Sequence, residues 1–108
     1  MILVIGGRGA GKRRFVEGEL GYAPEQIASC PQAGIPVLYG LEALEVLPSL
    51  EDLLEREVVV CQEVGCGVVP MDRGEREHRE AVGRLCCTLA EQAEAVYRLT
   101  CGIPMRLK

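Results

Sequence analysis

A short segment near the start of the chain combines backbone freedom with positive charge. It reads Gly6-Gly7-Arg8-Gly9-Ala10-Gly11-Lys12 and fits the pattern G-x-x-x-x-G-K. Glycines let successive backbone N–H groups turn toward one anion without a clash from side chains. The Lys12 ammonium would then reach the β- and γ-phosphate oxygens of a nucleotide. The spacing therefore predicts a phosphate-binding loop, and the alternative is a glycine-rich turn that only packs.

The residue after this lysine departs from the usual pattern. Ser or Thr normally stands there, and its hydroxyl ligates Mg²⁺. This chain has Arg13, and a guanidinium cannot ligate a metal. Arg13 would either supply charge to the phosphates or mark a site that binds nucleotide without turning it over. The residues that we expect to bind nucleotide are Gly6, Gly7, Arg8, Gly9, Ala10, Gly11, Lys12 and Arg13.

Glu63 is the best candidate for a functional carboxylate. It comes just after the apolar run Val58-Val59-Val60, at the expected C-terminal end of a central strand. Open α/β sheets place their ligands at this end of the strands. We predict that Glu63 holds metal-bound water or a nucleotide hydroxyl, and the alternative is a loop carboxylate that caps local N–H groups. Lys12 and Glu63 are therefore the candidate catalytic residues.

The histidine and the cysteines provide weaker evidence for a functional site. His78 is the one histidine, and we expect it on the exposed face of a long helix. The cysteines form no C-x-x-C pair, so no zinc site is expected, and their thiols are predicted to fill the core or its margin. The cysteines are Cys30, Cys61, Cys66, Cys86, Cys87 and Cys101.

The elements that must position the loop follow from the hydrophobic pattern. Met1–Ile5 is a continuous apolar run that ends at the glycines, as in a strand buried on both faces of a parallel sheet. Further strands are expected at Gln26–Cys30, Val37–Tyr39, Glu57–Cys61 and Val96–Cys101, and a short tail should follow the last. Helices are expected at Arg13–Leu20, Leu41–Val46, Ser49–Leu54, and from the cap Asp72 to about Gln92.

This alternation predicts one P-loop α/β domain over residues 1–108, a small and mostly parallel sheet flanked by helices. Gly21 should stop the first helix, and the loop Gln62–Met71 should precede the last. The last helix should bury a stripe with spacings of three and four. The stripe contains Val82, Leu85, Leu89, Ala93 and Val96.

Composition limits the classes of function. The chain has 108 residues, a net charge of −4, and 48% apolar but only 4% aromatic residues. The acidic balance argues against nucleic-acid binding, and no apolar run is long enough for a membrane span. We therefore expect a cytoplasmic globular protein, and its thin core predicts a homo-oligomer.

Four segments together resemble the bifunctional adenosylcobinamide kinase / adenosylcobinamide-phosphate guanylyltransferase family. That family has an N-E-V-G-x-G-[IV]-V-P segment after a central strand, then G-R-[IL] in a helix, and G-I-P after a strand. The resemblance covers residues 1–20 and 57–108. The matching segments are Gly6 to Arg14, Cys61-Gln62-Glu63-Val64-Gly65-Cys66-Gly67-Val68-Val69-Pro70, Gly83-Arg84-Leu85 and Gly102-Ile103-Pro104.

The resemblance implies a cytosolic enzyme of cobalamin biosynthesis that binds GTP or ATP and is able to use Mg²⁺ as a cofactor. The family phosphorylates the aminopropanol hydroxyl of adenosylcobinamide and then transfers GMP through a guanylylated histidine. No histidine precedes His78, so we do not expect guanylyl transfer by that route. One alternative is a catalytically degenerate homologue that binds nucleotide or corrinoid as a regulatory or partner subunit. Another is an unrelated P-loop kinase that acts on a different small alcohol.

Overall fold

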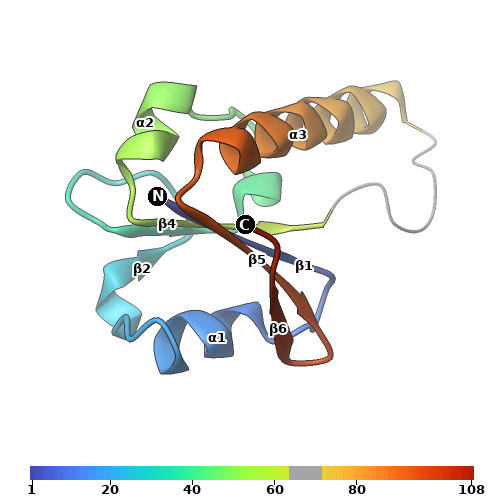
Figure 1. The fold of residues 1–108 in the computed structure, drawn as a ribbon. Coiled ribbons are helices and arrows are strands. Elements are labelled where there is room, and N and C mark those ends of the chain that lie inside the picture. Colours follow the sequence, from blue (N-terminus) through green and yellow to red (C-terminus); the bar gives the residue numbers. More distant parts are fainter. Residues whose placement is uncertain (64–71) are drawn as a thin grey trace.

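The computed structural model describes residues 1–63 and 72–108 and places their strands in one six-stranded sheet (Figure 1). The strand order is β2-β3-β4-β1-β5-β6. All neighbours are parallel except β5 and β6, which pair antiparallel. The strands are β1 (Ile2–Gly6), β2 (Ile27–Ala28), β3 (Val37–Tyr39), β4 (Val58–Gln62), β5 (Ala95–Thr100) and β6 (Ile103–Arg106). The mixed α/β architecture with a mostly parallel sheet is thereby confirmed.

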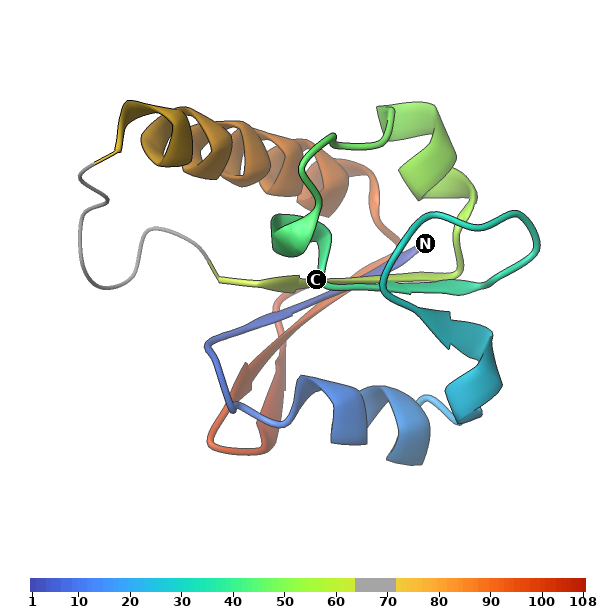
Figure 2. The ribbon, with the colours of Figure 1, turned by 180° about the vertical axis from the view of Figure 1, so that it is seen from behind.

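Helices cover both faces of this sheet. The helix α1 (Lys12–Gly18) lies on one face, and α2 (Leu50–Glu55) and α3 (Arg73–Gln92) lie together on the other (Figures 1 and 2). Two short 3₁₀ turns, η1 (Pro24–Gln26) and η2 (Leu41–Ala43), lie between the early strands in sequence. The sheet is therefore the middle of three layers.

The core forms two apolar layers, one on each face of the sheet. Successive side chains of a strand point to opposite faces, so β4 contributes to both layers. Val59 and Cys61 pack in the cluster beneath α2 and α3, whereas Val58 and Val60 pack with Phe15 of α1. This explains why the most buried strand has an unbroken apolar sequence.

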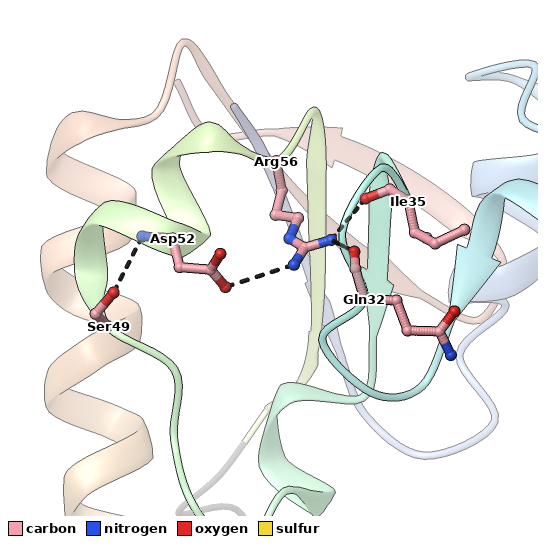
Figure 3. A network of polar contacts seen from close by, with 5 residues as sticks. All are labelled: Gln32, Ile35, Ser49, Asp52 and Arg56. Atoms are coloured by element: carbon pink, nitrogen blue, oxygen red, sulfur yellow. Dashed lines mark hydrogen bonds and ion pairs between the residues drawn. The ribbon is translucent and has the colours of Figure 1, made fainter.

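A polar network ties α2 to the chain segment that enters β3 (Figure 3). The Arg56 guanidinium donates to the backbone carbonyls of Gln32 and Ile35, at 2.5 and 2.7 Å. It also lies 3.5 Å from the Asp52 carboxylate, and the Asp52 backbone N–H donates to the Ser49 hydroxyl. The predicted cap at Ser49 is thus confirmed, and one side chain joins α2 to a loop distant in sequence.

Several element boundaries agree with the sequence. The strand at Val37–Tyr39 is confirmed, and the long helix begins after its cap Asp72 and ends at Gln92. The first helix, however, ends at Gly18 rather than Leu20. The predicted loop Gln62–Met71 begins one residue later than expected, because Gln62 pairs with Gly6 in the sheet. Residues 64–71 of that loop lie outside the described residues.

Two expectations for the C-terminal region were wrong. Val96 belongs to β5, in agreement with the strand predicted at Val96–Cys101, and not to the stripe of the preceding helix. The expected tail is the strand β6, because Cys101 and Gly102 both have positive φ angles, 51° and 77°. Positive φ at both residues of a two-residue loop matches the twist of a β-hairpin, so the chain reverses and pairs with β5.

The prediction that the thiols fill the core holds for only some of them. Cys61 is buried and Cys86 is half-buried, but Cys30, Cys87 and Cys101 are exposed. A hydrogen bond with Cys86, together with burial, raises the pKa of the Cys61 thiol. Cys66 lies outside the described residues.

Candidate functional site

The predicted site residues come together at one edge of the sheet. The strands β1, β4 and β5 are parallel, and Gly6 aligns with Gln62 on one side and Leu99 on the other. The Glu63 backbone N–H donates to the Gly6 carbonyl over 2.8 Å. The two segments that the sequence singled out, the loop after β1 and the residue after β4, therefore meet at the carboxyl ends of their strands.

The glycine loop (residues 6–12) is held in shape by its own backbone and by the β5–β6 turn. The Ala10 N–H donates to the Gly7 carbonyl over 3.2 Å, and the Gly102 N–H donates to the Ala10 carbonyl over 2.9 Å. A Cβ added at Gly6 would lie 2.9 Å from the Leu99 carbonyl oxygen, a distance that side chains do not tolerate. Gly11 has a φ of 91°, a left-handed value that suits glycine.

Lys12 is the one buried charged residue among those that the structure describes, and 7% of its surface is exposed. Its Nζ donates to the carbonyls of Gly7 and Gly6, over 2.8 and 3.2 Å. An ammonium carries three N–H donors, so these two bonds leave one. The lysine is therefore turned inward along the glycine loop, and its charge lies against the backbone of that loop.

The remaining basic residues of the segment are exposed. The Arg13 Nε lies 3.3 Å from a Glu17 carboxylate oxygen, and its guanidinium carbon lies 5.7 Å from the centre of the Tyr39 ring. These contacts hold Arg13 between α1 and the end of β3. Arg8 is exposed within the loop.

Glu63 has a partner that the sequence did not suggest. Arg98 of β5 places its Nη2 3.0 Å from Glu63 Oε1 and 3.2 Å from Oε2. Because strand order cannot be read from a single sequence, nothing pointed to Arg98 beforehand. The candidate carboxylate is thus held by a cation beside the glycine loop.

A comparison with protein families now adds evidence independent of this geometry. Residues 40–107 match the family model described as cobinamide kinase / cobinamide phosphate guanyltransferase. The chain belongs to this family. Among curated proteins, no sequence matches significantly. Membership confirms the resemblance drawn from the sequence and removes the alternative of an unrelated kinase.

The cobinamide kinase family match includes Glu63 and Arg98 but begins after the glycine loop. The assignment of the glycine loop as a phosphate-binding loop therefore depends on its own sequence and geometry.

Within residues 1–63 and 72–108, none of the helices has the length and apolar character that a membrane span requires.

The matched part also contains His78, for which the sequence-based expectation was wrong. The side chain is half-buried, and its Nε2 lies 3.0 Å from the Glu42 carbonyl oxygen. It lines a hollow of about 690 Å³ between η2 and the start of α3. In the same region the Glu42 carboxylate accepts a 2.7 Å hydrogen bond from the Gln62 backbone N–H. The chain turn at η2 brings Glu42 to this helix, which no local pattern reveals.

Proposed function

We propose that this family member binds the phosphates of GTP or ATP at a P-loop formed by residues 6–13 of a single α/β domain. The observation that carries the proposal is the inward position of Lys12 along the glycine loop. Burying an ammonium is costly unless acceptors surround it. The two carbonyls accept two of the three Lys12 N–H donors. A phosphate oxygen that accepts the third would offset the free-energy cost of burying this ammonium.

We infer further that the reaction is phosphoryl transfer to the aminopropanol hydroxyl of adenosylcobinamide. The hydroxyl oxygen forms a bond to the γ-phosphorus, and the bond from that phosphorus to the bridging oxygen breaks. The nucleoside diphosphate leaves with that oxygen and the electron pair, and the hydroxyl proton passes to water. Lys12 stabilises the charge on the transferred group. Glu63, fixed by Arg98, accepts a hydrogen bond from the hydroxyl and orients it.

Mg²⁺ does not find its usual ligand in this loop. Arg13 replaces the hydroxyl residue and is engaged with Glu17, and both Glu63 oxygens lie near Arg98. Protein-bound Mg²⁺ normally combines one or two carboxylates with phosphate oxygens and water. Arg13 and Glu63, as the structure places them, therefore do not fit a protein-held Mg²⁺.

The binding step is tested by calorimetric titration with GTP and ATP. Lys12→Ala should weaken nucleotide binding about tenfold or more, because a hydrogen bond to a charged group is lost. Lys108→Ala is a matched control, since the Lys108 Nζ also donates to two backbone carbonyls, those of Ala90 and Glu91. If wild type and Lys12→Ala show the same weak binding at millimolar nucleotide, the proposal is wrong.

A second candidate function is nucleotide or corrinoid binding without turnover. The contacts of Arg13 with Glu17 and Tyr39 favour it, because they occupy the side chain that would replace a metal-binding hydroxyl. Incubation with nucleotide, adenosylcobinamide and a series of divalent metals distinguishes the two functions. Phosphorylated corrinoid detected by mass spectrometry supports the kinase, and tight binding without product supports the regulatory homologue.

A further inference from the structure

A second hollow lies beside the glycine loop, on the face of the sheet that α1 covers. Its volume is about 560 Å³, within the range of roughly 300–1,000 Å³ typical of small-molecule sites. The walls are residues 9–11 of the loop, one side of α1 and the turn at Cys101–Gly102. The hollow therefore continues directly from the backbone that we propose holds the phosphates.

Two of these walls are fixed to each other. The Gly102 N–H bonds to the Ala10 carbonyl, and a Cβ on Gly11 would come within 3.2 Å of the Gly102 Cα. On the α1 side, Phe15 is buried and its ring centre lies 5.1 Å from that of Tyr97. The hollow is thus bounded by packed and hydrogen-bonded parts of the fold.

The side of α1 that faces the hollow has space for a ligand. Residues three and four apart share a helix face, so Arg14 and Gly18 lie on one side. A Cβ at Gly18 would meet no atom within 4 Å, and its φ lies outside the left-handed range. The glycine is therefore not required by the backbone there, and its lack of a side chain leaves the hollow open.

The hollow also carries two charged groups of opposite sign. Arg14 and Glu19 are both exposed and line it, and within the described part of the chain neither side chain has a hydrogen bond or ion pair. By contrast, the neighbouring Arg13 and Glu17 pair with each other. At a rise of 1.5 Å per residue, Glu19 lies roughly 12 Å from Gly11 along the axis of α1, which is comparable to the length of a ribose and a base.

We propose that this hollow holds the nucleoside part of the nucleotide and that Glu19 makes the site prefer guanine over adenine. The inference rests on the proposed binding of phosphates at the glycine loop. A guanine presents two adjacent N–H donors, N1–H and N2–H, which one carboxylate accepts together. The same edge of adenine offers one donor beside an acceptor nitrogen, which repels the carboxylate. The Arg14 guanidinium stacks on the base.

Four ligands separate the nucleoside hollow from the phosphate loop: tripolyphosphate, GTP, ATP and xanthosine triphosphate. Binding of each is measured by calorimetry with the full chain. Glu19→Gln should weaken GTP binding roughly 10- to 100-fold and leave tripolyphosphate binding unchanged. It should strengthen the binding of ATP and of xanthosine triphosphate, because each base places one donor beside one acceptor, as the glutamine amide does. Glu51→Gln, an exposed carboxylate on α2, is the matched control and should change nothing.

Gly18→Leu tests the hollow itself. Leucine favours a helix more than glycine does, so the fold should be retained, and unchanged tripolyphosphate binding confirms it. GTP and ATP should both bind at least tenfold more weakly, because the side chain fills the hollow.

The outcomes separate the two proposals. If tripolyphosphate binds in a Lys12-dependent manner but neither Gly18→Leu nor Glu19→Gln alters nucleotide binding, the nucleoside site is wrong and the phosphate loop stands. If Gly18→Leu prevents binding of both GTP and ATP, and Glu19→Gln leaves the ratio of GTP affinity to ATP affinity unchanged, the guanine preference is wrong. If wild type binds none of the four ligands, both proposals are wrong.

Discussion

Glu63 and Arg98 form an ion pair across the end of β1, the strand that leads into the glycine loop. Arg98 belongs to β5 and Glu63 follows β4, and β1 lies between these two strands in the sheet. The closest nitrogen and oxygen are 3.0 Å apart, and the Arg98 and Glu63 side chains are 47% and 26% exposed, respectively. The pair thus places a carboxylate beside the loop at a position set by two separate strands.

This pair should matter for reaction more than for stability. We expect Glu63→Gln to lower the rate of corrinoid phosphorylation about tenfold or more, because the amide orients the acceptor hydroxyl less strongly than the carboxylate does. Its effect on the free energy of unfolding should stay below about 1 kcal/mol, as for other partly exposed pairs. The measurements are product formation at saturating nucleotide and urea denaturation.

A matched control is Glu77→Gln, which breaks the exposed Arg73–Glu77 pair on α3. It should leave both quantities unchanged. Equal rates for Glu63→Gln and wild type would remove Glu63 from the site.

The glycine at the start of the loop should be required by packing. We expect Gly6→Ala to destabilise the fold by roughly 1–3 kcal/mol, because its Cβ would press on the Leu99 carbonyl at 2.9 Å and the neighbouring strand must shift. Gly18→Ala, where a Cβ meets nothing within 4 Å, should be neutral or slightly stabilising. Thermal melts of the two variants provide the comparison, and a melting temperature for Gly6→Ala equal to that of wild type would contradict the close approach.

Arg56 should contribute more to stability than other arginines that form ion pairs. Its side chain is 9% exposed and bonds to two backbone carbonyls, so Arg56→Ala removes both bonds and leaves the part-buried Ile35 carbonyl without its donor. We expect a loss of about 1–3 kcal/mol in the free energy of unfolding, measured with urea. Arg73→Ala removes an equally spaced i,i+4 pair whose arginine is 88% exposed, and should cost less than about 0.5 kcal/mol.

Tyr22 should make stability depend on alkaline pH. Desolvation, and then the hydrogen bond to Glu57, raise the pKa of the Tyr22 hydroxyl above its ordinary value. The folded state therefore favours the protonated phenol. This contribution is fully present below the ordinary pKa near 10 and is lost as the pH rises through the higher pKa of the folded state.

Denaturation of wild type and Tyr22→Phe at a series of pH values tests this coupling. Between about pH 9 and 12, wild type should lose more stability than Tyr22→Phe, which has no hydroxyl to ionise. Parallel pH profiles would show that the fold does not raise the pKa of the Tyr22 hydroxyl.

Features governed by neighbouring residues could be predicted from the sequence. The apolar run before the glycines, the caps at Ser49 and Asp72, and the position of Lys12 just inside a helix all depend on contacts within a few residues. Such contacts are fixed by backbone sterics and local hydrogen bonds. The same is true of Glu63, whose place after an apolar run located it at the end of a strand.

Features that join segments distant in the sequence could not be predicted from the sequence. The order of β4, β1 and β5 decides that Arg98 meets Glu63, and the positive φ of Cys101 decides that the chain turns back as β6. The packing of η2 against α3 decides that His78 is half-buried.

By itself, the sequence determined a glycine loop between a buried strand and a helix, with a lysine placed to serve it. Only the tertiary structure decided which charges surround that loop and that a hollow opens between α1 and the β5–β6 turn. The physical reason is that a side chain's local preferences act over a few residues, whereas strand order and register depend on how the whole apolar surface is buried at once.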